Sequence, residues 1–288
     1  MSAGAPRLSN DYDGPCAVCG AVVAAGTGVL RHGPTGGWEV FHPEHDREPA
    51  PPARQDLPGW HRRRLMALDI TTTGNRAAVD RVLTAAVRVS DGTSRDWLLD
   101  PGSDPLSVAP GKGHDITIER ARAEGVPAPR ALAELATVLV DHLAAKELLV
   151  VWFAPHVLTL LHAEFLRHGV TPPADRLPGG LAPVCDPLVL DRHADRYRPG
   201  RRSLEAVTAW YGVPHDRPGD AASDAEATLR LAQVIGASYP ALARLSRPVL
   251  HAEQILWNAD QSRHHRDPLD WPFTPIAPRP WQDPPGDG

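Results

Sequence analysis

Apolar and polar positions follow two different periods along the middle of the chain. Short apolar or β-compatible runs, one of them ending at Asp69, are typical of partly or fully buried strands. Two of these runs flank Ser90-Asp91-Gly92-Thr93, a tight-turn signal that predicts a hairpin. The pattern predicts strands at residues 65–68, 81–89, 95–99 and 148–153.

Between and after these runs, apolar residues recur at helical spacing, for example Leu132, Leu135 and Leu139. The predicted helices cover residues 131–143, 156–168, 204–211 and 221–235, with one or two more in 241–260. Strands mixed with helices in this order predict an α/β or α+β domain, in which helices flank a mixed sheet.

Composition shifts divide the chain further. Closely spaced prolines in 48–60 favour an extended linker. The expected division is a disordered N-terminus at 1–12, a metal-binding module at 13–47, the linker at 48–60, the main domain at 61–239, a helical extension at 240–262 and a disordered Pro-rich tail at 263–288.

The overall charge excludes one class of protein. Thirty Lys and Arg against 35 Asp and Glu give a net charge of −5 and a pI near 6.3, so the chain is no polycation that coats nucleic acid. No signal-peptide pattern opens the sequence, and its longest apolar run, 148–154, is too short to span a membrane. We expect a cytoplasmic protein without a membrane partner; its oligomeric state stays open.

The module at 13–47 carries a candidate zinc site. Its four candidate ligands are Cys16, Cys19, His42 and His45. A C-x-x-C pair followed by Gly20 forms the turn that brings two thiolates to one ion, and four protein ligands make a closed, structural site. A module this short needs such a staple. His32 is a reserve ligand, Cys185 is interpreted as a buried thiol, and coincidence of unrelated residues is the alternative.

Four motifs of the main domain, in order, resemble those of the DnaQ-like 3′–5′ exonucleases, the DEDD group of the ribonuclease H-like superfamily. They are Leu68-Asp69-Ile70-Thr71-Thr72-Thr73-Gly74, His114-Asp115-Ile116-Thr117, Val150–Val157 and Gly219-Asp220-Ala221-Ala222-Ser223-Asp224-Ala225. The resemblance covers about Arg62 to Ile235. It implies a ribonuclease H-like exonuclease fold and a reaction in which two divalent ions, held by four carboxylates, cleave phosphodiester bonds beside a histidine base.

Residue by residue, the chain departs from that pattern. The first and last acidic positions survive as Asp69 and Asp224, whereas the other family positions are Thr71, Val157 and, for the histidine, Gly219. Halving the carboxylates leaves Mg²⁺ or Mn²⁺ at best weakly bound at Asp69 and Asp224. Alternatively, these two aspartates only cap or hydrogen-bond locally. Substitute groups nearby in the sequence are His156, His215 and Asp220.

An arginine cluster suits phosphate contact, with Tyr197 available for base stacking. With His114, the candidate nucleic-acid residues are Arg192, Arg196, Tyr197, Arg198, Arg201 and Arg202. The alternative is a solvated loop.

These observations predict a nucleic-acid-associated pseudo-exonuclease, whose partner is a single strand or a 3′ end. Two other hypotheses stay open: an active 3′–5′ exonuclease with noncanonical ligands, and a protein-interaction module that never meets nucleic acid.

Overall fold

The computed structural model describes residues 8–32, 37–46, 50–104, 106, 115–196, 198, 200–263 and 271. They form two compact units. The small unit comprises residues 1–51 and 195–201, and the large unit comprises 52–194 and 202–288. Each unit is described by itself below, within these ranges.

The small unit contains two short antiparallel sheets. The first has the order β1 (Leu8–Ser9), β4 (Val29–His32) and β5 (Trp38–Phe41), and the second pairs β2 (Gly14–Pro15) with β3 (Val22–Val23). The side chain of Asn10, 2% exposed, links the segments by donating to the carbonyls of Tyr12 and Ala24 and accepting from the amide of Gly28. This buried side-chain amide therefore cross-links chain segments that the short strands do not hold together by themselves.

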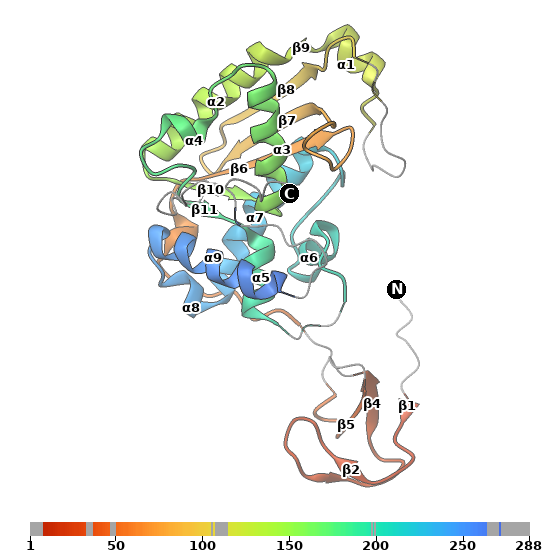
Figure 1. Cartoon of the computed structure of the whole chain (residues 1–288). Coiled ribbons are helices and arrows are strands. Elements are labelled where there is room, and N and C mark those ends of the chain that lie inside the picture. The colour runs from red at the N-terminus through yellow and green to blue at the C-terminus, as the bar shows by residue number, and fades with distance from the viewer. Residues whose placement is uncertain are drawn as a thin grey trace, which may run out of the picture. The chain divides into compact units, whose positions relative to one another are not determined.

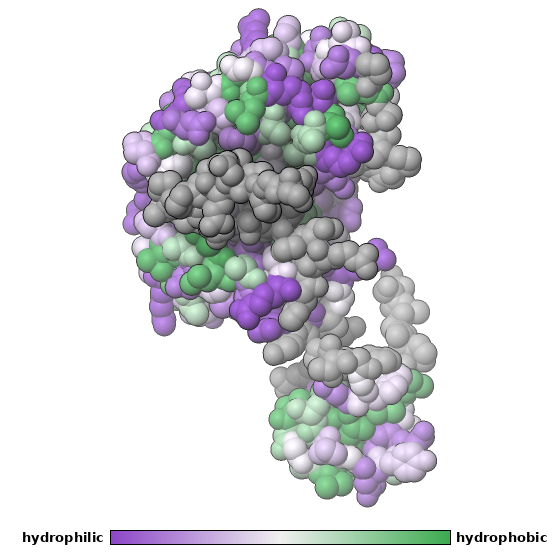
Figure 2. All heavy atoms as spheres, in the orientation of Figure 1, coloured by the Kyte–Doolittle hydropathy of each residue, from purple (hydrophilic) through white to green (hydrophobic). Residues whose placement is uncertain are grey.

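Much apolar surface stays outside this small core. Tyr12 is 83% exposed, and Val18, Val22 and Trp38 are more than half exposed. Figure 2 shows apolar residues on the surface of the small unit. A chain segment of this length buries too little apolar surface to be stable unaided, which makes a cross-link from a metal physically useful.

A six-stranded mixed sheet forms the centre of the large unit (Figure 1), with the strand order β11-β10-β6-β7-β8-β9. Strands β6, β7 and β8 pair antiparallel, while β10 runs parallel to β6, as β11 does to β10 and β9 to β8. The strands are β6 (Leu65–Thr72), β7 (Val82–Val89), β8 (Ser94–Asp100), β9 (Val126–Pro127), β10 (Leu148–Val151) and β11 (Val184–Cys185).

Helices cover both faces of this sheet (Figure 1). They are the 3-10 turn η1 (Trp60–Arg62) and α1 (Ile118–Glu124), α2 (Ala128–Ala144), α3 (Ala154–Arg167), α4 (Pro173–Arg176), α5 (Pro187–Ala194), α6 (Leu204–Trp210), α7 (Ala221–Ser238), α8 (Pro240–Ala243) and α9 (Arg247–Ser262). The predicted mixed sheet flanked by helices is confirmed. The sequence pattern missed the two-residue strands β9 and β11 and the helices α1 and α5, whose apolar runs are short.

Alternation along β6 explains where the candidate site lies. Leu65 and Ala67 belong to the core on the α7 side, whereas Met66 and Leu68 belong to the core that α2 and α3 cover. Because side chains of a strand alternate between faces, Asp69 continues the α7 side. A bulge in the β6–β7 ladder follows at Thr71/Thr72, and bulges often mark the place where a strand re-aims a side chain toward a site.

Trp271 is buried, although it lies in the segment that we expected to be a disordered tail. This residue, assigned from sequence to 263–288, is 7% exposed and packs in the core on the α2 and α3 side, edge-on to the ring of His251. The other residues of the predicted tail from 264 onward lie outside the described residues.

None of the helices in the described ranges has both the length and the apolar character needed to cross a lipid bilayer.

Candidate functional site

The four predicted zinc ligands come together in the small unit. One ligand atom from each of Cys16, Cys19, His42 and His45 lies within 4.8 Å of all the others. Cys16 Sγ is 3.4 Å from His45 Nδ1, and Cys19 Sγ is 3.6 Å from His42 Nδ1. A tetrahedral zinc ion with ligands at about 2.0–2.3 Å separates neighbouring ligand atoms by about 3.3–3.8 Å. The donor set and its spacing therefore fit zinc.

Backbone turns and contacts with short strands hold these ligands; Cys16, for example, forms a bridge with Val40 of β5. The amide of Gly20 donates to the carbonyl of Cys16 at 2.8 Å, in the left-handed conformation (φ +72°) that favours glycine. His42 Nε2 lies 3.3 Å from the carbonyl of Val22, which leaves Nδ1 toward the thiols, as second-sphere contacts of metal ligands do. Burial disfavours the Cys16 thiolate, but hydrogen bonds from the backbone of His42 and Cys19 and from the His45 ring lower the pKa of Cys16 to about 5.

The two aspartates that the sequence analysis assigned to the exonuclease-like pattern lie near each other in the large unit. Asp69 on β6 and Asp224 in the first turn of α7 are close enough that the charge of Asp224 raises the pKa of Asp69. Burial is the larger cause, and the pKa of Asp69 lies well above its ordinary value. A carboxyl group in this setting tends to keep its proton, and a protonated carboxyl is a poor ligand for a hard cation.

Asp224 already has protein partners. His215 Nε2 lies 2.6 Å from Asp224 Oδ1, and the amide of Gly219 donates to both carboxylate oxygens at 3.1 Å. Burial raises the pKa of Asp224, while the contact with His215 opposes this shift. Sequence reasoning named His215 only as a neighbour in the chain; the fold brings its ring onto the last family carboxylate.

The three replaced positions contribute no further charge. The hydroxyl of Thr71, 5% exposed as a residue, points toward the carbonyl of Gly219 at 3.4 Å, too long for a strong hydrogen bond. Val157 is 8% exposed and packs in the apolar core. Gly219 has φ +89°, a left-handed conformation in which a histidine would be strained.

These residues do not fit a pair of divalent cations. A two-ion centre needs several charged oxygen ligands. Of the two aspartates predicted as ligands, Asp69 has a raised pKa and Asp224 already binds His215 and the amide of Gly219. No step of a reaction can be assigned to Mg²⁺ or Mn²⁺ here.

A cleft of about 700 Å³ is lined by residues that neighbour the two aspartates in the chain, although neither aspartate is part of its lining. Thr71 and Gly219 are part of its wall, together with residues of β7 and β8 and the start of α7. Its charged lining residues are Asp96, Asp115, Arg120, Arg217 and Asp220. Asp220 also accepts from the amide of Ser223 as the N-cap of α7, so this substitute candidate has a structural role.

Phe153 is a residue that the sequence analysis did not single out as a binding residue. It follows β10 in a left-handed conformation (φ 52°), rare for an aromatic residue, yet its side chain is 39% exposed. Its ring stacks on His156, with centroids 5.3 Å apart and planes at 17°. The buried carboxylate of Asp186 holds this conformation by accepting from the amides of Phe153 and Ala154. Strand β10 pairs with β6, which brings this aromatic pair to the end of the sheet where Asp69 lies.

The predicted arginine cluster is divided. Arg202 pairs with Asp191, whose side chain is fully buried and also accepts from the hydroxyl of Tyr211 at 3.1 Å. Arg192 lies on α5, where burial lowers the pKa of its guanidinium. Arg202 and Arg192 are therefore partly engaged within the large unit, Arg202 by an ion pair and Arg192 by burial.

The remaining members of that cluster belong to the small unit. Arg198 is 8% exposed, whereas Arg196 and Arg201 are exposed. Exposed arginines remain suited to phosphate contact. Tyr197 and His114 lie outside the described residues.

Comparisons with known proteins give one kind of match. No protein-family model matches the chain, and no curated protein matches it. Among solved structures, exonuclease I is similar, with 22% identity over 62% of this chain and 42% of that chain, at a TM-score of 0.54. E. coli exonuclease I in complex with a dT13 oligonucleotide gives the same four values, and an ExoI/SSB-Ct complex matches at 21% identity and a TM-score of 0.53.

The chain spans about two fifths of the length of these structures. Identity this low shows the fold alone. Over 62% of its length, the chain shares the fold of a part of exonuclease I.

Proposed function

We propose that this protein binds single-stranded nucleic acid through its exonuclease-like fold and has lost all or nearly all metal-dependent cleavage at 3′ ends. One observation carries the loss of cleavage: His215 and the Gly219 amide occupy the carboxylate of Asp224 next to an Asp69 whose pKa is raised. Losing a general base alone costs about 10²–10⁴-fold in rate, and the missing ligands add to that.

Retained binding is supported by the cleft and by Phe153. The lining of the cleft of about 700 Å³ includes Arg120 and Arg217, which suit phosphate groups, beside three aspartates. The exposed residue Phe153 is held in a costly backbone conformation after β10, at the end of the sheet where Asp69 lies, and strained residues of this kind concentrate where a ligand is bound. Solved structures of the same fold include exonuclease I with single-stranded oligonucleotides.

In the small unit, we propose one structural zinc ion on Cys16, Cys19, His42 and His45. All four positions are protein ligands, which leaves no open position for a substrate. Zinc there would fold the unit rather than take part in catalysis.

The decisive experiment is an end-labelled oligonucleotide incubated with protein in excess and Mg²⁺ or Mn²⁺. We expect no shortening, in the wild type or in Asp69→Ala. Shortening by the wild type that disappears in Asp69→Ala would overturn the proposed loss and establish an active exonuclease with noncanonical ligands. Product that persists in Asp69→Ala identifies a contaminating nuclease, and the assay is repeated on repurified protein.

Binding is tested separately, by fluorescence anisotropy of a labelled single strand at two salt concentrations. We expect affinity to fall as salt rises, because phosphate contacts release counterions. Absence of salt-sensitive binding would favour the remaining alternative, a protein-interaction module.

A further inference from the structure

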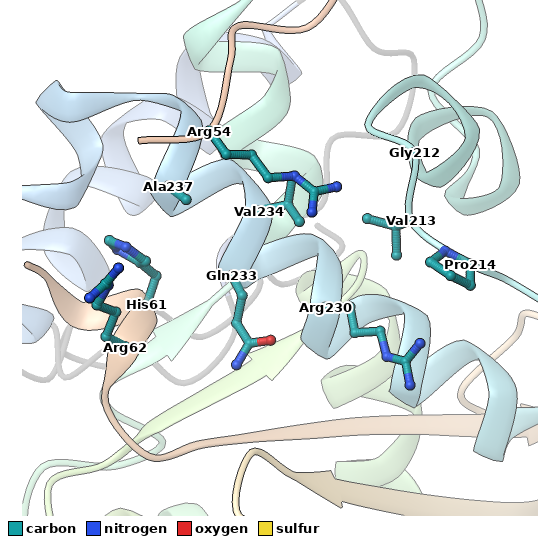
Figure 3. Close-up of a pocket in the computed structure, with 10 residues that line it drawn as sticks. All are labelled: Arg54, His61, Arg62, Gly212, Val213, Pro214, Arg230, Gln233, Val234 and Ala237. Carbon is teal, nitrogen blue, oxygen red and sulfur yellow. The ribbon is translucent and has the colours of Figure 1, made fainter. Parts of the chain in front are cut away.

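A second pocket of the large unit lies away from the cleft and has no part in the proposed chemistry. It has a volume of about 560 Å³. Figure 3 shows its lining: Arg54, His61, Arg62, Gly212, Val213, Pro214, Arg230, Gln233, Val234 and Ala237. The residues come from the segment before β6, the α6–α7 loop and the second half of α7.

The charged residues that line this pocket are all arginines, in a chain whose net charge is −5. His61 adds no charge near neutral pH, because burial lowers its pKa. Arg62 pairs with Asp56 and Arg230 with Glu226, with the carboxylates 89% and 38% exposed; exposed pairs like these give way readily to a phosphate. Arg54 uses one nitrogen to donate to the carbonyl of Tyr211. The pocket is therefore complementary to an anion.

The arrangement of the arginines indicates an extended anion rather than a single phosphate. In Figure 3, Arg54, Arg62 and Arg230 lie on different sides of the hollow, with Gln233 and Val234 between them. A lone phosphate is held by groups that converge on one point, whereas separated cations with apolar surface between them suit a strand whose phosphates are spaced along a chain of sugars and bases.

The pocket and the cleft share structural elements. Residues 212–214 line the pocket and Arg217 to Ala222 line the cleft, so the α6–α7 loop borders both. The stretch of α7 from Ala222, in the cleft, to Val234, in the pocket, spans about 18 Å at about 1.5 Å per residue. A single strand of several nucleotides can bridge that length.

We propose that this pocket is a second contact for the same single strand, which would leave the cleft along α7 and place phosphates near Arg230, Arg54 and Arg62. The inference rests on the proposed function, since the cleft supplies the other end of the strand. It assigns the pocket to nucleic acid and not to an acidic protein segment.

The test compares a labelled oligo(dT) of about four nucleotides with one of about sixteen, a range typical of single-strand-binding folds. The pocket variants are Arg230→Gln and Gln233→Glu; the second adds a negative charge without removing any contact described here. Arg130→Gln is the matched control, because Arg130 forms the same kind of i,i+4 pair on α2, with Glu134.

We expect the wild type and Arg130→Gln to bind the long strand on the order of tenfold more tightly than the short one. Both pocket variants should lose this gain while they keep the short-strand affinity. The salt dependence of long-strand binding should also fall, by about 0.7 in logarithmic slope, for the one contact that Arg230→Gln removes.

Other outcomes separate the two proposals. If both pocket variants still bind the long strand more tightly than the short one by the wild-type factor, the proposed second contact is wrong, while binding at the cleft is unaffected. Failure of both oligonucleotides to bind overturns the proposed function together with this inference. Binding of a poly-glutamate peptide that depends on Arg230, with oligonucleotide affinity unchanged by the substitutions, would assign the pocket to an acidic protein segment and also overturn the inference.

Discussion

The two candidate metal regions of this chain treat their anionic ligands in opposite ways. In the small unit, hydrogen bonds from His42, Cys19 and His45 outweigh burial and bring the pKa of Cys16 down to about 5. In the large unit, burial and the charge of Asp224 raise the pKa of Asp69. The first environment stabilises a ligand in the form that binds metal, and the second disfavours it. The comparison teaches that a surviving ligand residue is informative only together with the groups that set its charge.

The largest effect is expected when the thiols of Cys16 and Cys19 are removed. The double variant Cys16→Ser, Cys19→Ser should lose about one equivalent of zinc and unfold the small unit, because a structural zinc ion contributes about 10–16 kcal/mol of apparent binding energy in small domains. Elemental analysis and NMR spectra of the small unit measure both effects.

Cys185→Ala is the control, since Cys185 lies in the core of the large unit, on the α7 side of its sheet. It should keep the zinc. Wild-type protein that is purified without added chelator and contains no zinc would contradict the proposed site.

A smaller effect, on the affinity for a single strand, is expected when the ring of Phe153 is removed. Phe153→Gly removes the ring but suits the left-handed backbone, so the fold should be retained while single-strand affinity falls by about 1–3 kcal/mol, the contribution of one stacked base. Anisotropy titrations at fixed salt measure the loss.

Leu166→Ala on α3, the helix that begins directly after Phe153, is the matched control, because this residue is 59% exposed and its substitution should leave affinity unchanged. Equal affinity of Phe153→Gly and the wild type would remove Phe153 from the proposed interface.

The remaining expected effect is on stability against pH. The pKa of Asp69 is higher in the folded protein than in the unfolded chain, so ionisation of Asp69 lowers the free energy of unfolding. The contribution of the protonated group is fully present below the unfolded pKa, near 3.9. It is lost as pH rises through the folded pKa. Asp69→Asn should remove this loss, by about 1.4 kcal/mol for each unit by which the pKa is raised.

Urea unfolding of both proteins between mildly acidic and mildly alkaline pH measures this difference. The variant should gain on the wild type as pH rises. A constant difference across that range would mean that Asp69 ionises normally, and would reopen the question of a bound cation.

Sequence patterns were sufficient wherever neighbouring residues decide the structure. The apolar runs and helical spacings predicted the main strands and helices within a few residues, for example 81–89 against Val82–Val89. The candidate zinc ligands could be predicted because two tight turns, each carrying two of them, have recognisable spacing. The sequence also allowed Thr71 and Val157 to be aligned with acidic positions of the exonuclease-like pattern, since the four motifs occur in order along the chain.

Only the tertiary structure determined what surrounds these residues. His215 and Asp224 meet because the α6–α7 loop folds back on the first turn of α7, and Arg202 is paired because α5 carries Asp191 into the core. Phe153 owes its backbone conformation to Asp186, which is distant in sequence. Such pairings depend on how the sheet orders its strands and on which side chains lose water, and no local pattern encodes either.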